Sequence, residues 1–226
     1  MSTDAIKKAV GYKAVELVEN GMLIGLGTGS TVFFFIERLI QKCKEGLKIR
    51  AVASSDKSFQ QASHGNIPML DIEKVTALDL TFDGADEIDP LKRMIKGGGG
   101  AHVREKIVAT MSREMVVIVD ESKLVLALGK RKLPVEILPF ARNAIFRHIK
   151  KAGYHGEFRK KDDGTLFVTD NGNLLIDIQF DAIRKHPEQD HEILIHIPGV
   201  VDTGFFFNLA GRVIIGYTDG QVVIKP

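Results

Sequence analysis

Short apolar runs alternate with amphipathic stretches over about the first 125 residues of the chain. This alternation predicts buried strands at 22–26, 49–53, 78–82 and 115–119, and helices at 4–18, 55–63, 103–112 and from the turn at 27–31 to about Lys44. Asp4 is the expected N-cap of the first helix. Apolar runs bounded by turn residues are typical of strands covered on both faces. The pattern therefore predicts an α/β fold, with a Rossmann-like, mostly parallel sheet and helices on both faces.

The pattern changes near residue 130. A strand at 135–137, a helix at 139–152, strands at 154–159 and 173–179, a helix from Pro187 and a strand at 200–207 are expected. This β-α-β-β-α-β order is that of a ferredoxin-like α+β domain. Strands at 213–217 and 222–224 are expected to return to the first sheet. The predicted domains are therefore residues 1–129 with 207–226, and a smaller inserted domain at 130–206.

Composition and charge exclude several classes of protein. The chain has 226 residues, 44% of them hydrophobic, and its 31 Lys and Arg nearly balance its 29 Asp and Glu. Such a balance gives no electrostatic footprint for nucleic acid. No apolar run is long enough to span a bilayer, and no signal-peptide pattern is seen. Cys43, the only cysteine, has no disulfide partner in the chain. We expect a cytoplasmic protein with no nucleic-acid or membrane partner.

A run of four glycines at 97–100 follows Lys96 and precedes a predicted helix that carries Glu105. Glycines leave bare amide groups that can approach an anionic ligand closely. Lys96 could stabilise developing negative charge, and Glu105 could transfer a proton. The alternative is a flexible turn in which Glu105 only complements the helix dipole.

A second glycine-containing turn, Gly27-Thr28-Gly29-Ser30-Thr31, lies between a predicted strand and a predicted helix. Free amides and the helix dipole favour a phosphate at such a position. The turn fits neither the dinucleotide fingerprint nor the P-loop, because Ser30 stands where a glycine is needed and no Gly-Lys-Ser/Thr ending exists. A small phosphate ester therefore suits it better than a nucleotide. A tight connection without a ligand is the alternative.

Acidic residues follow the strand predicted at 78–82, in the sequence Asp83-Gly84-Ala85-Asp86-Glu87. The carboxyl end of a strand is the expected ligand edge of a parallel sheet. Asp83 and Asp86 could bind sugar hydroxyls and exchange their protons, or bind Mg²⁺, or form only a capped turn. Lys123 follows the strand at 115–119 and is expected at the same edge. The seven histidines form no set at metal-ligand spacing, so no metal is predicted.

Taken together, these segments resemble the type A ribose-5-phosphate isomerase family. The resemblance extends over nearly the whole chain, in order, and includes Lys-Gly-Gly-Gly at 96–99, Arg-Glu-Lys-Ile at 104–107, Leu-Pro-Val-Glu at 133–136, Thr-Asp-Asn-Gly-Asn at 169–173 and Ile-Pro-Gly-Val at 197–200, besides the motifs at 27–31 and 83–88. Two departures are Gly100 and His102, where alanine and a bulky apolar residue are more usual. The serine-rich segment 54–58 also varies a family loop.

The resemblance implies an aldose–ketose isomerase that interconverts D-ribose 5-phosphate and D-ribulose 5-phosphate through an enediol, in the non-oxidative pentose phosphate pathway. It implies Glu105 as the general base, and Asp83, Asp86 and Lys96 as the groups that open the furanose and stabilise the enediolate. The substrate contacts that it implies are Thr28, Gly29, Ser30, Thr31, Asp83, Gly84, Ala85, Asp86, Lys96, Gly97, Gly98, Gly99 and Lys123. It implies no metal or organic cofactor, and a homo-oligomer (a dimer or a dimer of dimers).

Two other functions are alternatives to the isomerase. A non-catalytic sugar-phosphate sensor of a transcription regulator would carry a DNA-binding module, for which we see no room before the first predicted strand, and would have little use for Glu105. A coenzyme A transferase on a related fold would need a larger chain and a glutamate in another context. The isomerase is therefore the function that the sequence favours.

Overall fold

The computed structural model describes residues 1–226, and the chain folds into two compact units. The first contains residues 1–85, 104–124 and 209–226, and the second residues 86–103 and 125–208. The sequence places residues 86–103 in the larger domain, whereas their contacts group them with the second unit. The reason is that this segment pairs with strands and loops of the second unit. The predicted domain division itself stays a prediction.

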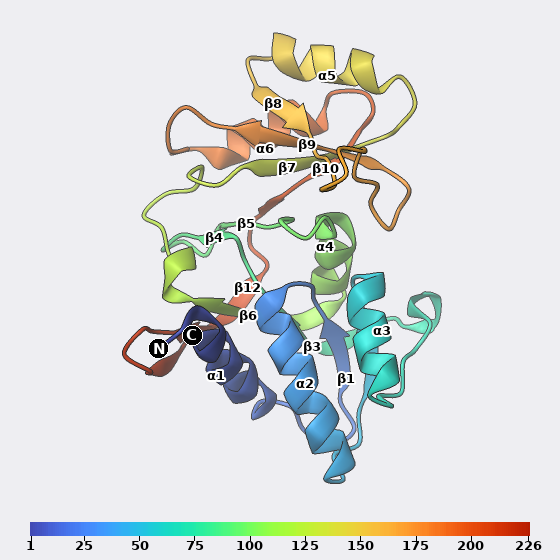
Figure 1. Cartoon of the computed structure of the whole chain (residues 1–226), viewed down its shortest axis with the longest axis vertical. Helices are drawn as coiled ribbons and strands as arrows, with labels where there is room; N and C mark the ends of the chain where they lie inside the picture. The colour runs from blue at the N-terminus through green and yellow to red at the C-terminus, as the bar shows by residue number, and fades with distance from the viewer. The chain divides into compact units, whose positions relative to one another are not determined.

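The first unit is built on a six-stranded sheet with the order β13-β12-β6-β3-β1-β2 (Figure 1). Its strands are β1 (Leu23–Leu26), β2 (Arg50–Ala53), β3 (Leu78–Asp83), β6 (Ser112–Asp120), β12 (Ala210–Gly216) and β13 (Val222–Lys225). All neighbours pair in parallel except β12 and β13, which pair antiparallel. The mostly parallel α/β sheet, with the last two strands returning to it, is confirmed.

Helices cover both faces of this sheet. The helices α1 (Thr3–Val15), α2 (Ser30–Lys44) and α3 (Asp56–His64) share one apolar cluster with the strands, which includes Val10, Phe35 and Phe82. Val108 of α4 (His102–Thr110) packs with Val52 and Leu78 in a different cluster, joined by Ile72 of the 3-10 helix η1 (Ile72–Lys74). The prediction that Asp4 is the N-cap of the first helix is wrong. Ser2 caps α1 by accepting a hydrogen bond from the amide of Ala5, and the helix ends at Val15 instead of Val18.

The second unit contains a four-stranded antiparallel sheet with the order β10-β7-β9-β8. Its elements, in chain order, are β7 (Leu133–Ile137), α5 (Arg142–Lys151), β8 (His155–Phe158), β9 (Leu174–Gln179), α6 (Pro187–Ile195) and β10 (Val200–Thr203). This is the predicted β-α-β-β-α-β order. The helix α5 begins three residues after the predicted start at Pro139, because Ala141 has a left-handed backbone with φ of 54°.

Three very short strands form a separate sheet in the second unit. They are β4 (Glu87–Ile88), β5 (Met94–Ile95) and β11 (Phe205–Phe206), in the order β11-β5-β4. The strand predicted at 200–207 is therefore two strands, β10 and β11, which join different sheets. Strands of two residues are too short to show an alternating pattern, so β4 and β5 were not predicted.

Two motifs far apart in the sequence meet inside the second unit. Glu136 of β7 is fully buried, and its Oε1 accepts hydrogen bonds from the side-chain amides of Asn171 and Asn173, at 3.0 and 2.8 Å. The hydroxyl of Thr169 also donates to this oxygen, at 3.2 Å. One buried carboxylate thus fixes the turn at 169–173. This gives the Leu-Pro-Val-Glu and Thr-Asp-Asn-Gly-Asn motifs a shared structural role.

Candidate functional site

Three neighbouring parallel strands, β1, β3 and β6, bring predicted site residues of the first unit to one edge of the sheet. Thr28 follows β1, Asp83 ends β3, and Lys123 ends the 3-10 helix η2 (Glu121–Lys123) after β6. The carboxyl ends of parallel strands are where α/β sheets bind ligands. The expected placement of these three residues at a common edge is therefore found.

The loop at 27–29 is held by hydroxyl groups from the segment after β2, which runs into the first turn of α3. The hydroxyl of Thr28 lies 3.0 Å from that of Ser54 and donates to that of Ser55 at 2.8 Å, and Ser58 donates to the carbonyl of Gly27 at 2.6 Å. All three serines are buried. Gly29 stands at the N-terminus of α2 with no side-chain cap, so the first amides of this helix are not covered by a capping side chain.

The loop at 27–29 is also joined to Asp83. The amides of Thr28 and Gly84 both donate to Oδ1 of Asp83, at 3.1 and 2.8 Å. Asp83 is fully buried. A Cβ atom on Gly27 would lie 2.1 Å from the carboxyl carbon of Asp83, so only glycine fits there. The turn between β1 and α2 and the carboxylate that ends β3 are thus packed as one piece.

Glu105 lies in the first turn of α4 and is 3% exposed. The helix is anchored one turn later, where the carbonyl of Val108 accepts a hydrogen bond from the hydroxyl of Ser112 at 2.8 Å. Val108 packs against Gly25 of β1, where a Cβ would lie 2.7 Å from Cγ1 of Val108. In the chain, α4 lies in the connection that leads from β3 to the parallel strand β6. Its N-terminal turn therefore lies at the carboxyl edge of the sheet. Glu105 is therefore a buried carboxylate at the ligand edge.

The second unit holds the predicted residues Asp86, Lys96 and 97–99 around β5. Lys96 is 2% exposed, its amide donates to the carbonyl of Gly204 at 2.8 Å, and its ammonium group lies 5.3 Å from the ring centre of Phe206. Asp86 donates its amide to the carbonyl of Ile95 and accepts from the amide of Gly98, both at 2.8 Å. Lys96, Asp86 and the glycines are therefore brought together by the pairing of β4 with β5.

Glu87, between these residues in the sequence, has a structural role. It is 1% exposed and accepts hydrogen bonds from the amides of Gly129 and Arg131. Burial raises the pKa of the Glu87 carboxyl above its ordinary value, although the two amides oppose this rise. Glu87 thus ties the segment 129–131 to β4.

His102, one of the two departures from the family pattern, is fully buried, and its Nε2 lies 3.4 Å from the carbonyl oxygen of Asp202.

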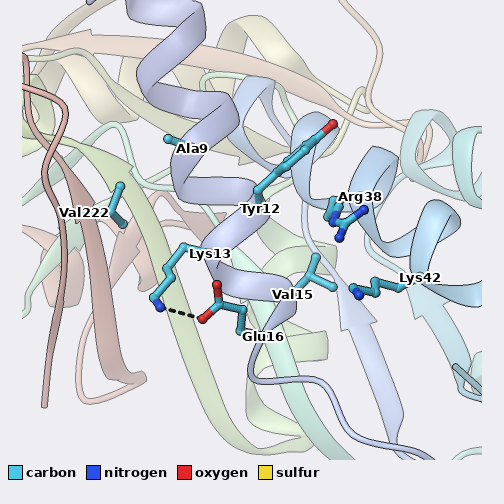
Figure 2. Close-up of a pocket in the computed structure, with 8 residues that line it drawn as sticks. All are labelled: Ala9, Tyr12, Lys13, Val15, Glu16, Arg38, Lys42 and Val222. Atoms are coloured by element: carbon cyan, nitrogen blue, oxygen red, sulfur yellow. Dashed lines mark hydrogen bonds and ion pairs between the residues drawn. The ribbon is translucent and has the colours of Figure 1, made fainter. Parts of the chain in front are cut away.

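A pocket of about 490 Å³ in the first unit lies among α1, α2 and β13 (Figure 2). Its lining residues are Ala9, Tyr12, Lys13, Val15, Glu16, Arg38, Lys42 and Val222. Its charged side chains are engaged with neighbours: Lys13 pairs with Glu16, Lys42 pairs with Glu45, and Arg38 lies over the ring of Tyr12. None of the predicted site residues lines this pocket.

Two further observations concern metals and membranes. The structure contains no group of three or more His, Cys, Asp or Glu side chains arranged to hold a metal ion. The helices are also too short or too polar to cross a bilayer.

A family model of ribose 5-phosphate isomerase A (phosphoriboisomerase A) matches residues 50–220. The ribose-5-phosphate isomerase A of Protochlamydia amoebophila is 52% identical over 218 residues, which cover 96% of this chain and 94% of the relative. That of Chlamydia felis is 47% identical over 96% of this chain and 93% of its own length. The chain belongs to the ribose 5-phosphate isomerase A family.

Solved structures of the ribose 5-phosphate isomerase A family have the same fold as this chain. The ribose 5-phosphate isomerase from Plasmodium falciparum superposes with a TM-score of 0.94 at 38% identity, covering 98% of each chain. A D-ribose-5-phosphate isomerase in complex with phospho-erythronic acid gives a TM-score of 0.93 at 36% identity, covering 100% of this chain and 99% of the other. The resemblance that the sequence motifs indicated is thereby confirmed.

The sequence did not identify every residue that shapes the site. Ser54 and Ser55 contact Thr28 and Ser58 contacts Gly27, yet the sequence indicated only a variable family loop and the start of a helix for these serines. Their position directly after a strand that neighbours β1 is the signal that could have found them. Arg159 contacts two of the glycines and is not among the residues expected at the site. No local pattern marks Arg159, because its partners are about sixty residues away in the chain.

Proposed function

We propose that this chain interconverts D-ribose 5-phosphate and D-ribulose 5-phosphate through an enediol intermediate. The observation that carries the proposal is Glu105, a buried carboxylate in the first turn of α4, in a chain of this family. Moving a proton between adjacent carbons needs one base that faces both carbons and an electrophile near their oxygens. A buried glutamate suits this task, because its surroundings hold it in a fixed orientation.

Each predicted residue has a distinct role in the proposed reaction. The loop at 28–31 binds the phosphate, since the N-terminus of α2 supplies amides and a favourable dipole. Asp83 and Asp86 bind sugar hydroxyls and move their protons during ring opening. Lys96 neutralises charge on the enediolate oxygen, and the amides of residues 97–99 assist it. Lys123 is a further ligand contact, and Gly84 and Ala85 leave room for the sugar beside the carboxylates.

The proton transfer itself follows from the chemistry of the open-chain sugar. Glu105 removes the proton from carbon 2 of the aldose, and the electron pair forms the carbon–carbon double bond of the enediol. Glu105 then returns the proton to carbon 1, while the hydroxyl proton on carbon 2 leaves to give the ketone and the oxygen on carbon 1 gains a proton to become a hydroxyl. The two steps need no external oxidant or reductant. The same residues catalyse the reverse reaction.

The biological setting is proposed from the substrate. A reaction on five-carbon sugar phosphates belongs to the non-oxidative pentose phosphate pathway, which operates in the cytoplasm. We also propose a homodimer, because Phe33 of α2 is 43% exposed next to Phe34. Exposed aromatic side chains on a helix are typical of an interface between subunits. Light scattering after size-exclusion chromatography gives the mass in solution, and a monomer at micromolar concentration would contradict this part of the proposal.

The function is tested by incubating the purified chain with ribose 5-phosphate in EDTA and measuring the ketose that forms. Ribose without phosphate is the control substrate, because the loop at 28–31 is proposed to bind the phosphate. We expect turnover of ribose 5-phosphate and a much lower kcat/KM for ribose. A chain that forms no ketose from ribose 5-phosphate, with or without added Mg²⁺, would show that the proposed function is wrong.

A further inference from the structure

Arg159 follows β8 and binds the glycine loop, which we define as residues 97–100. Its Nη1 donates to the carbonyl oxygens of Gly97 and Gly98, at 2.9 and 3.1 Å. The same guanidinium donates from Nε to Oδ2 of Asp177 at 2.9 Å, and its second terminal nitrogen donates to Oδ1. The side chains of Arg159 and Asp177 are only 15% and 13% exposed. A bidentate pair of this kind holds the guanidinium in one orientation.

The two carbonyls held by Arg159 determine where two amides point. A peptide group is planar and trans, so the C=O of one residue and the N–H of the next point in opposite directions. Both carbonyls face Arg159, and the amides of Gly98 and Gly99 therefore face away from it. The amide of Gly98 donates to Oδ2 of Asp86 at 2.8 Å, which confirms this direction. The amide of Gly99 points to the same side as Asp86.

Without Arg159 this segment would have few restraints. Glycine has more backbone freedom than any other residue, and a run of four loses the most entropy when it is ordered. The amide of Gly100 donates to the carbonyl of Gly97 at 3.0 Å, which closes one turn. Gly98 and Gly99 are nevertheless exposed, so packing does not fix them. The orientation of their peptide groups therefore depends on the partners of their carbonyls.

We propose that Arg159 is a positioning residue for the isomerase reaction, held by Asp177. Through the peptide group between Gly97 and Gly98 it orients the carboxylate of Asp86, and through the next peptide group it presents the amide of Gly99 to the sugar phosphate. Arg159 itself does not touch the substrate. This inference rests on the proposed function, in which Asp86 and the glycine amides act on the sugar.

Arg184 provides a matched control in the same unit. It forms a bidentate pair with Asp190, at 2.7 and 2.6 Å, and lies 5.0 Å from the ring centre of Phe180. Arg159 has the same two kinds of partner, since it lies 5.8 Å from the ring centre of Phe167. Both arginines thus contribute an ion pair and a ring contact. Only Arg159 also binds carbonyls of the glycine loop.

The experiment compares Arg159→Ala, Arg159→Lys and Arg184→Ala with the wild-type chain. We expect kcat for ribose 5-phosphate to fall about 10- to 100-fold in Arg159→Ala, as a misplaced group commonly causes. Arg184→Ala should keep kcat within about twofold of the wild-type value, even if its melting temperature falls by as much as that of Arg159→Ala. Arg159→Lys keeps the charge but lacks the planar fork, so it should fold and still lose about tenfold in kcat. Added guanidinium ion should restore part of the activity of Arg159→Ala.

A second readout does not depend on activity. In the ligand-free protein, the NMR amide signals of Gly98 and Gly99 should shift in Arg159→Lys and stay unchanged in Arg184→Ala. Equal kcat in the Arg159 and Arg184 variants, or unmoved Gly98 and Gly99 signals, would overturn the proposal. If Arg159→Ala does not fold, the proposal is tested by comparing the kcat of Arg159→Lys with that of Arg184→Ala. A wild-type chain without isomerase activity would refute the proposed function instead, while the amide signals would still test the orientation of the loop.

Discussion

Gly27 lacks a side chain at the point where the carboxylate of Asp83 lies, and a Cβ on Gly27 would be 2.1 Å from the Asp83 carboxyl carbon. The amide of the next residue, Thr28, donates to the same carboxylate. The glycine therefore permits the close approach of the β1–α2 turn to the end of β3. Any side chain at 27 has to move either the turn or Asp83.

Gly27→Ala is expected to lower kcat about 100-fold or more, because a displacement of about 1 Å in a reacting group commonly has this effect. Overpacking should also lower the free energy of unfolding by about 1–3 kcal/mol. Gly65→Ala is the control, since its Cβ would lie 2.3 Å from the side chain of Ile40, away from the predicted site residues. Equal kcat in the two variants would argue against a catalytic role for Asp83.

Glu105→Gln is expected to bind substrate normally and to lose roughly 10²–10⁴ in kcat, the usual contribution of a general base. Glutamine has the same shape but cannot accept the carbon-bound proton. Steady-state kinetics with ribose 5-phosphate give kcat and KM separately. Glu73→Gln, at an exposed position in η1, is the control for removing one carboxylate. Near-normal turnover in folded Glu105→Gln would remove Glu105 from the mechanism.

Thr28→Ala and Thr31→Ala are expected to raise KM more than they lower kcat. A hydrogen bond to a charged group contributes about 1.5–3 kcal/mol, which corresponds to roughly 10- to 150-fold in affinity. Thr28→Ala also removes the partner of Ser54 and Ser55. Ser63→Ala, on the exposed side of α3, should leave KM unchanged. A phosphate bound elsewhere in a ligand complex would contradict the assignment of this loop.

The enediol route predicts exchange of the transferred proton with solvent. The reaction run in D₂O should place deuterium on carbon 1 of the ketose and label part of the recovered aldose. A hydride shift never releases the hydrogen, so it would give no label. Mass spectrometry and proton NMR of both sugars measure the incorporation. Complete turnover without any deuterium would exclude Glu105 as a base that exchanges with water.

The buried carboxyl of Glu87 is expected to make the stability of the folded protein depend on pH. Its folded-state pKa is raised by burial above the ordinary value of 4.5, so its stabilising contribution is fully present below that value and is lost as the pH rises through the folded-state pKa. The melting temperature of the wild type relative to Glu87→Gln should therefore fall as the pH rises from about 4.5 to 7.

Glu157 is the control for this pH dependence, because a hydrogen bond from Lys132 lowers its pKa. The melting temperature of the wild type relative to Glu157→Gln should therefore rise with pH over the acid range. Slopes of the same sign for the two glutamates would contradict the assigned environment of Glu87.

Elements with a strong periodic pattern could be predicted from the sequence, and those determined by distant partners could not. The alternation of apolar runs in the first half predicted the parallel sheet, because a buried strand such as β3 needs apolar side chains on both faces. Asp4 was expected as the N-cap of α1 from its residue type, but Ser2, the residue that caps the helix, is of an equally suitable type. The strands β4 and β5 depend on pairing with each other and with β11.

In the candidate site, too, the positions that depend on local sequence could be predicted, and the contacts between distant residues could not. Thr28, Asp83 and Lys123 could be placed at one edge, because each follows a predicted strand of a parallel sheet. The contacts that hold them were not predictable. Ser58 reaches Gly27 from thirty-one positions along the chain, and Arg159 reaches Gly97 from sixty-two. Contacts of this kind are products of the tertiary fold, and no local pattern encodes them.

Gly100 and Phe167 have a consequence for how this sequence can change. Gly100 has φ of +83°, and a Cβ there would lie 2.5 Å from Cε1 of the Phe167 ring. An alanine at this position would therefore meet the ring as well as the strained backbone. A smaller residue at 167 removes the first obstacle. Substitutions at the two positions are thus epistatic, and a lineage that acquires alanine at 100 is expected to have lost the aromatic ring at 167 beforehand.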